Sequence, residues 1–158
     1  MRSVLRLVVC VAVCYAIAAL GGYVTVRNIP TWYASLVKPP WTPPNWLFPI
    51  VWNILYGMIA LSLWLLWDRT AAGVQRTRVL RLFVLQLVLN CLWTPVFFGA
   101  HYIWPAQAII LALLGTIVGV IALAWPINRW AALLLIPYAL WVTYASTLNA
   151  GIGYLNGG

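Results

Sequence analysis

Residues 38–52 read KPPWTPPNWLFPIVW and run directly into a long apolar segment. The stretch holds five prolines and three tryptophans. Proline fixes φ and removes an amide donor, so this density of proline is incompatible with regular helix and with sheet. The sequence therefore predicts a stiff, aromatic loop at the entrance of a hydrophobic helix, separating one apolar run from the next.

The composition around this loop is that of a membrane protein. Of the 158 residues, 65% are hydrophobic and only 6% are charged. Soluble domains carry about 25% charged residues, so nine Lys and Arg with one acidic residue cannot cover a water-exposed surface. The net charge of +8 does not indicate nucleic-acid binding, because the basic residues lie between apolar runs and form no groove with polar surroundings.

Five apolar runs are long enough to span a bilayer. They lack the alternation of a membrane barrel strand, and no internal repeat suggests an inverted-repeat transporter. We therefore predict an all-α fold, an integral membrane bundle of five transmembrane helices in a single domain over 1–158, with the first loop at 27–45. The predicted spans are about 4–26, 46–67, 79–98, 104–125 and 130–154.

The N-terminus also permits a secretory signal peptide. A basic start is followed by an apolar run and by Ala16-Ile17-Ala18, which resembles a cleavage site. The apolar run continues to Val26, however, which is longer than the roughly 7–15 residues of a signal-peptide core. We interpret it as a retained first helix.

The basic residues are distributed unequally between the two sides of a five-span chain. Seven of them share a side with the N-terminus, and two lie on the other side. The positive-inside rule then predicts a cytoplasmic N-terminus, with the proline-rich loop and the C-terminus facing outward. The first group is Arg2, Arg6, Arg69, Arg76, Arg78, Arg81 and Arg129, and the second is Arg27 and Lys38.

The sequence contains few groups that could perform hydrolysis or ion coupling. No Ser/His/Asp set, carboxylate pair or phosphate-binding loop is present. Asp68 lies at a helix end beside Arg69, where it would pair or face water, and His101 lies in a connector. Cys10 and Cys14 are one helical turn apart but have no further soft ligand nearby, so we expect a structural role and no metal site.

Amide and indole side chains recur at helical spacing within the spans. The third span carries Gln86, Asn90, Trp93 and Thr94; the second carries Trp52, Asn53 and Tyr56; the fifth carries Trp141, Ala145 and Asn149; and Trp104 opens the fourth. Two interpretations remain open. Such groups can hold helices together, or they can wall an aromatic, uncharged pocket for a large planar ligand.

Gly115 and Gly119 form a GxxxG pair in the fourth span. This spacing allows two helices to approach closely, either within the fold or between protomers.

Three segments identify a family. WYASLVKPPWTPPNWLFPIVWNILY (32–56), QLVLNCLWTPVFFG (86–99) and PYALWVTYASTLN (137–149) resemble the tryptophan-rich sensory protein / translocator protein family, also called peripheral-type benzodiazepine receptors. The resemblance covers the whole chain, with the segments in the expected order. It implies a five-helix bundle in a bacterial cell membrane, commonly a homodimer, that binds porphyrins such as protoporphyrin IX or haem without an obligatory cofactor.

The resemblance also implies the ligand-binding residues. The pocket would lie between the helices beneath the first loop, with Trp41 and Trp46 at the loop or its edge. The remaining positions are Trp52 and Tyr56 in the second span, Asn90 and Trp93 in the third, Trp104 in the fourth, and Trp141, Ala145 and Leu148 in the fifth.

One departure from the family bears on the ligand. Sterol-binding members carry an aromatic-then-basic segment after the fifth helix, whereas no Lys or Arg follows Tyr154 here. We therefore expect porphyrin rather than cholesterol. The leading hypothesis is a porphyrin-binding sensor that regulates tetrapyrrole or stress metabolism. The alternatives are a tetrapyrrole transporter or exporter, a light-dependent porphyrin-degrading enzyme, and a purely structural bundle.

Overall fold

The computed structural model describes residues 2–157 and is all-α over that range, as predicted. Each of its five long helices is long and apolar enough to cross a membrane. A short helix lies in the first loop, and one π-helical turn extends the third span. The long helices are α1 (Arg2–Asn28), α3 (Leu47–Asp68), α4 (Val74–Thr94), α5 (Ile103–Ala124) and α6 (Arg129–Asn156); the short helix is α2 (Trp32–Ser35) and the π-helical turn is Pro95–Gly99.

The predicted spans differ from the helices mainly at the start of the third. This helix begins at Val74 rather than at residue 79, so Arg76 and Arg78 lie in its first turns and not in a connector. Arginine is a good helix former whose charged head can reach water past its apolar stem, so the helix can continue beyond the apolar run. The first loop also contains α2, which ends before the prolines begin.

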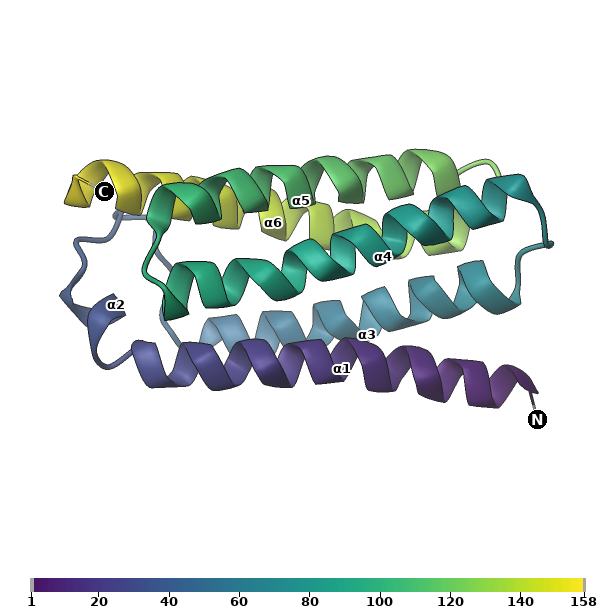
Figure 1. The fold of residues 1–158 in the computed structure, drawn as a ribbon, viewed down its shortest axis with the longest axis horizontal. Helices are drawn as coiled ribbons and strands as arrows, with labels where there is room; N and C mark the ends of the chain where they lie inside the picture. Colours follow the sequence, from purple (N-terminus) through teal and green to yellow (C-terminus); the bar gives the residue numbers. More distant parts are fainter. Residues whose placement is uncertain (1, 158) are drawn as a thin grey trace.

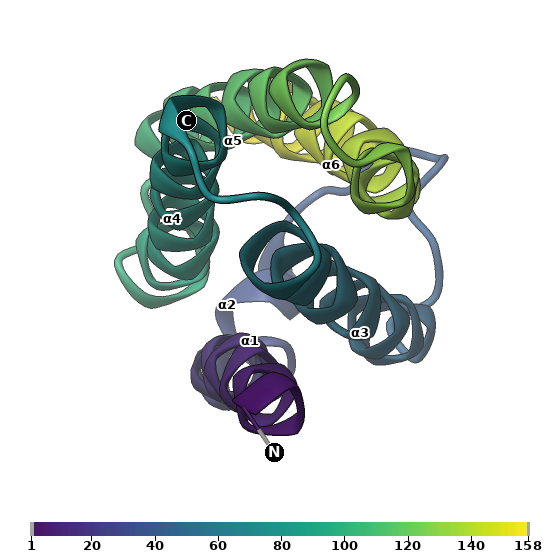
Figure 2. The ribbon, with the colours of Figure 1, turned by 90° about the vertical axis from the view of Figure 1, so that its right-hand side faces the viewer.

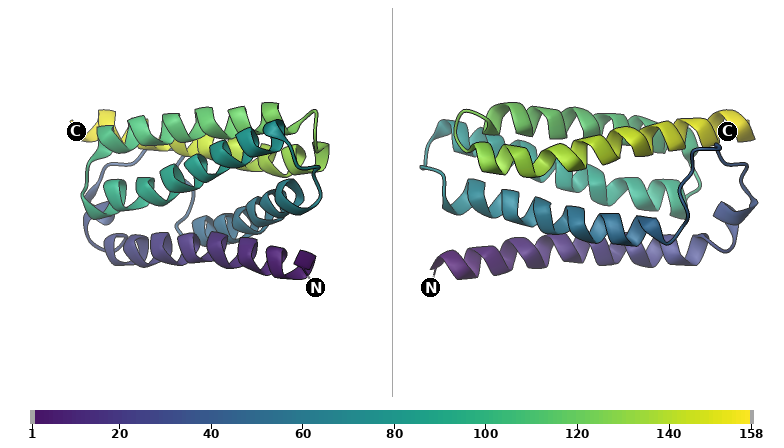
Figure 3. Two further views of the ribbon diagram at one scale, coloured as in Figure 1. Left: turned by 45° about the vertical axis from the view of Figure 1, so that its right-hand side comes forward. Right: turned by 180° about the vertical axis from the view of Figure 1, so that it is seen from behind.

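The five long helices run up and down and form a ring, which is clearest when viewed along the bundle (Figures 1 and 2). Around this ring α1 packs on α3, α3 on α6, α6 on α5 and α5 on α4, while α1 and α4 make fewer contacts with each other. The N-terminus and the C-terminus lie at opposite ends (Figure 3). The loop between α1 and α3, with α2, covers the same end as the C-terminus (Figure 1).

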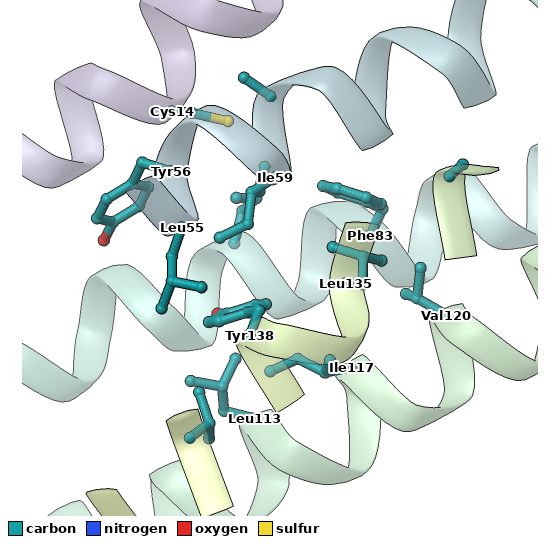
Figure 4. Close-up of a cluster of buried hydrophobic side chains, with 14 of the residues drawn as sticks. Cys14, Leu55, Tyr56, Ile59, Phe83, Leu113, Ile117, Val120, Leu135 and Tyr138 are labelled. Atoms are coloured by element: carbon teal, nitrogen blue, oxygen red, sulfur yellow. The ribbon is translucent and has the colours of Figure 1, made fainter. Parts of the chain in front are cut away.

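Tightly packed apolar side chains fill the half of the bundle nearer the N-terminus. Ile59, Phe83 and Leu135 are at most 1% exposed, and Figure 4 shows them gathered between the helices with Ile117 and Tyr138. This core leaves the other half of the bundle, nearer the loop, free to hold a cavity.

Only one member of the GxxxG pair makes a close helix contact within the fold. A Cβ added at Gly119 would lie 2.9 Å from Leu82 Cδ2, so its lack of a side chain lets α4 and α5 approach. A Cβ added at Gly115 would meet no atom within 4 Å.

The chain's single acidic residue joins α1 to α3. Asp68 accepts hydrogen bonds from Ser3 Oγ at 2.6 Å and from Arg6 Nη1 at 3.0 Å, and Arg69 Nε lies 3.3 Å away. Of the two alternatives that the sequence left open, pairing or exposure to water, the structure shows pairing. The N-terminus, the α3–α4 connector and the α5–α6 connector all lie at this end of the bundle (Figure 1).

Candidate ligand-binding cavity

A cavity of about 440 Å³ lies in the loop-proximal half of the bundle. Its wall is formed by α1, α3, α4 and α6, with the π-helical turn, the first loop and two residues of α5 completing it. Pockets for drug-sized ligands span roughly 300–1,000 Å³, so this one is large enough for such a molecule. Within the described chain, its lining includes no Asp, Glu, Lys, Arg or His.

Aromatic rings make up much of the wall. The Trp52 and Tyr56 ring centroids are 5.5 Å apart on α3, and Phe48 meets Trp141 edge-on at 5.9 Å. Trp93 stacks on Phe97, with ring centroids 5.3 Å apart and planes inclined by 12°. Such surfaces favour flat, largely apolar ligands that can stack on them.

A buried chain of hydrogen bonds supports the wall between α3, α4 and α6. Tyr56 Oη donates to Asn90 Oδ1 at 2.6 Å, Asn90 Nδ2 donates to Tyr138 Oη at 2.8 Å, and Tyr138 Oη donates to Gln86 Oε1 at 3.1 Å. Tyr56 and Asn90 line the cavity, whereas Tyr138 and Gln86 lie behind them. The chain holds three helices in register and presents an amide to the cavity.

The two cavity tryptophans of α4 and α6 differ in how they are held. Trp93 Nε1 donates to Asn149 Oδ1 at 3.2 Å, and Asn149 Nδ2 donates to the carbonyl of Ile103 at 2.9 Å. Trp141 Nε1 is buried and has no hydrogen-bond partner. The Trp93 indole is therefore anchored, and the Trp141 indole retains an unused donor.

The α1 side of the cavity is built from small residues that no polar or aromatic pattern in the sequence marks. Ala18, Gly21, Gly22 and Thr25 line it, at offsets of three, four and seven that place them on one helix face. Their short side chains leave room opposite the tryptophans. The helical spacing of small residues was visible in the sequence, but an unbroken apolar run does not show which face of a helix turns inward.

The π-helical turn brings two more aromatic residues to the cavity. Pro95 has no amide to donate, and the wider turn that follows is closed by a bond from the Ala100 amide to the Pro95 carbonyl at 2.8 Å. Phe97 and Phe98 are both buried and both line the cavity as a result. Sequence spacing for an ordinary helix did not predict that these neighbours share a wall.

The first loop is fastened to α6. Asn156 pairs with the backbone of Val37 through two hydrogen bonds of 3.0 and 2.9 Å. Tyr144 Oη donates to the carbonyl of Trp41 at 2.5 Å, and a Cβ at Gly151 would lie 2.5 Å from Pro39 Cγ. Gly151 is therefore needed for the loop to rest on α6.

The same loop reaches the cavity through Tyr33. This side chain is 5% exposed and lines the cavity, and burial raises the pKa of its hydroxyl above the usual range, which keeps the phenol neutral. The Lys38 ammonium lies 4.7 Å from the Tyr33 ring centroid. Behind the loop, His101 stacks on Trp32 with ring centroids 4.3 Å apart.

The structure brings together most of the residues implied by the family resemblance. Seven line the cavity: Trp52, Tyr56, Asn90, Trp93, Trp141, Ala145 and Leu148. Trp41, Trp46 and Trp104 are 51%, 64% and 39% exposed and lie outside its lining. Trp41 and Trp46 belong to the loop and its junction with α3, while Trp104 packs edge-on against Tyr154. Four positions are suggested by helical spacing but not by the resemblance: Asn53, Thr94 and Asn149 line the cavity, and Gln86 does not.

We expect Asn156→Ala to loosen the loop without unfolding the bundle. Losing the pair with Val37 removes about 1 kcal/mol of hydrogen bonding, which corresponds to about five-fold faster hydrogen exchange at the Val37 amide. Exchange measured by mass spectrometry on peptides covering the loop tests this. The matched control is Thr147→Ala, because Thr147 bonds only to a carbonyl of its own helix. Unchanged exchange in Asn156→Ala would show that the pair does not hold the loop.

Comparisons with known proteins agree with this architecture. The model of the TspO/MBR family matches residues 10–155. The tryptophan-rich protein TspO of Archaeoglobus fulgidus is 36% identical over 98% of this chain and 99% of its own length. Protein CrtK of Rhodobacter capsulatus is 33% identical over 90% and 89%, and the translocator protein of Sus scrofa is 36% identical over 84% and 82%. Together with the five-helix fold, these matches show that the chain is a multi-pass integral membrane protein of the TspO/MBR family.

Proposed function

We propose that the cavity binds a planar tetrapyrrole of the porphyrin class, and that the protein acts as a membrane receptor or sensor for it. The proposal rests on the cavity of about 440 Å³, whose described lining is rich in aromatic rings and contains no charged side chain. Aromatic faces stack on a macrocycle, while the Asn90 amide offers a polar contact. The small residues of α1 leave space for a rigid, flat molecule.

The lining favours stacking over metal ligation. Iron porphyrins are held by His, Cys, Met or Tyr, and the described lining contains none of the first three. Of the three tyrosines in the described lining, Tyr15 and Tyr56 already donate to the Asn53 carbonyl and to Asn90. Burial raises the pKa of the third, Tyr33, which disfavours the phenolate that would bind iron. We therefore propose that recognition depends on the macrocycle, so that metal-free protoporphyrin IX binds at least as tightly as haem.

A fluorescence titration tests the proposal. Adding protoporphyrin IX to the purified protein in detergent micelles should quench tryptophan emission saturably, because Trp52, Trp93 and Trp141 line the cavity. Haem in a parallel titration should give an equal or weaker affinity. A strictly linear, non-saturating decrease in tryptophan emission would contradict porphyrin binding in the cavity.

We expect Lys38→Gln to weaken the binding of protoporphyrin IX selectively. The ligand carries two carboxylates, and the uncharged cavity offers them no cation, so they should point toward the loop, where Lys38 covers Tyr33. Losing a partly exposed ion pair costs about 0.2–1 kcal/mol, or about 1.4- to five-fold in affinity. The uncharged dimethyl ester should bind wild type and variant equally. Arg129→Gln, at the opposite end of the bundle, is the matched control. If Lys38→Gln weakened the binding of protoporphyrin IX and of its dimethyl ester equally, Lys38 would not be the partner of the carboxylates.

We further propose that the N-terminus faces the cytoplasm. The support is the charge bias, because seven arginines lie at or near the helix ends that meet beside Asp68, and only Arg27 and Lys38 lie toward the loop. In that orientation the loop faces outward.

A further inference from the structure

A second hollow lies on the outside of the bundle, between α3 and α6. This groove of about 480 Å³ is lined almost wholly by apolar groups, among them Val51, Met58 and Leu140. Ile54 and Leu140 on its two sides are 60% and 66% exposed. In a chain with five membrane-spanning helices these side chains face lipid, and Leu55 and Trp141 lie near the middle of their helices. The groove therefore opens into the hydrocarbon region of the bilayer.

Trp141 separates this groove from the internal cavity. It is a lining residue of both, so the same indole forms part of the cavity wall and part of the groove floor. Its aromatic contacts are edge-on and tilted, with Phe48 at 5.9 Å and Tyr144 at 5.6 Å between centroids, and it packs against the edge of the apolar core.

Moving this indole would break no hydrogen bond that the structure shows. Trp141 Nε1 is buried and has no partner, which is an uncommon state for a buried donor. Trp93, across the cavity, is anchored by Asn149 instead. Pro137, one turn earlier in α6, also lines the groove and cannot donate the usual helical bond to the carbonyl of Leu133.

We propose that the seam between α3 and α6 is a lateral portal, in which the groove receives a planar apolar ligand from the bilayer and Trp141 swings aside to admit it to the cavity. This inference rests on the proposed function and adds the route by which the ligand arrives. The occupant is the porphyrin itself, because the groove is continuous with its cavity through a single side chain. The loop, fastened to α6 by Asn156 and Tyr144, stays closed during this passage.

The portal predicts a kinetic effect without a change in affinity. Leu140→Trp and, separately, Met58→Trp place a large ring in the groove but outside the cavity lining. Mixing the detergent-solubilised variants with protoporphyrin IX in a stopped-flow instrument measures the association rate constant, and dilution of the complex into empty micelles measures the dissociation rate constant. Both rate constants should fall by about ten-fold while Kd stays at the wild-type value, because the barrier to passage rises and the bound state does not change.

Two controls make the result specific. Leu111→Trp places the same ring on the lipid-facing side of α5, where Leu111 is 52% exposed, and should leave both rates unchanged. Asn156→Ala loosens the loop and should not accelerate binding. The portal would be overturned if folded Leu140→Trp and Met58→Trp both bound and released protoporphyrin IX as fast as Leu111→Trp. Faster association in Asn156→Ala would also overturn it, because the ligand would then enter past the loop. If protoporphyrin IX does not quench the tryptophan emission of the wild-type protein saturably, the proposed function itself is wrong, and the portal is wrong with it.

Discussion

Ala145→Phe should abolish saturable protoporphyrin binding and leave the protein folded. Ala145 lies on α6 and lines the cavity beside Trp141 and Leu148. A phenyl ring at this position would occupy the space of the ligand. Because the ring enters an existing cavity, it should avoid most of the about 1–3 kcal/mol that overpacking costs in a filled core. We expect affinity to fall by at least about 100-fold, which corresponds to about 2.7 kcal/mol.

The control for this variant is Ala112→Phe. Ala112 lies on the exposed side of α5 and away from the cavity lining, so the same substitution should leave the wild-type Kd in place. Size-exclusion chromatography and circular dichroism would show whether both variants remain folded. A folded Ala145→Phe protein that binds protoporphyrin with wild-type affinity would place the ligand outside this cavity.

Asn90→Leu should destabilise the bundle as well as weaken binding. The substitution leaves the buried Tyr56 hydroxyl without its acceptor and removes one partner of Tyr138. An unsatisfied buried donor costs about 1–3 kcal/mol, which is a large fraction of the 5–15 kcal/mol typical of a folded domain. Unfolding followed by denaturant titration in mixed micelles would measure the loss. A purely structural bundle without a ligand predicts no effect on porphyrin titration.

A second substitution separates the orphaned hydroxyl from other effects of leucine. Tyr56→Phe in the Asn90→Leu background removes the hydroxyl that lost its acceptor, so the double variant should recover part of the lost stability. Strictly additive losses from the two substitutions would show that Tyr56 and Asn90 are not energetically coupled.

The sequence predicted the polar and aromatic part of the site more completely than the rest. Trp52 with Tyr56, and Asn90 with Trp93, stand out because amide and indole groups are rare inside membrane spans and recur at helical spacing. Each pair lies on one helix face, so a local pattern determines which residues point the same way. The structure places all four in the cavity lining.

Residues whose position depends on packing between helices could not be predicted in the same way. Gly21 and Gly22 reach the cavity because of the rotation of α1 against α3 and α4, which no contrast of polar and apolar residues in that run reveals. Gln86 shares a face with Asn90 in sequence, yet Tyr138 from α6 lies between it and the cavity wall, accepting from Asn90 and donating to Gln86. Phe97 and Phe98 became neighbours in the wall only through the π-helical turn.

The position of a metalloporphyrin in a co-crystal would show whether the cavity inside the bundle holds the ligand. Zinc protoporphyrin IX carries a single strong anomalous scatterer at the centre of its ring. We expect one zinc peak inside the bundle, between the Trp52 and Trp93 side of the cavity and the small residues of α1, with the ring close to Ala145. A peak on the outer surface of the helices, or no peak within the bundle at saturating ligand, would contradict it.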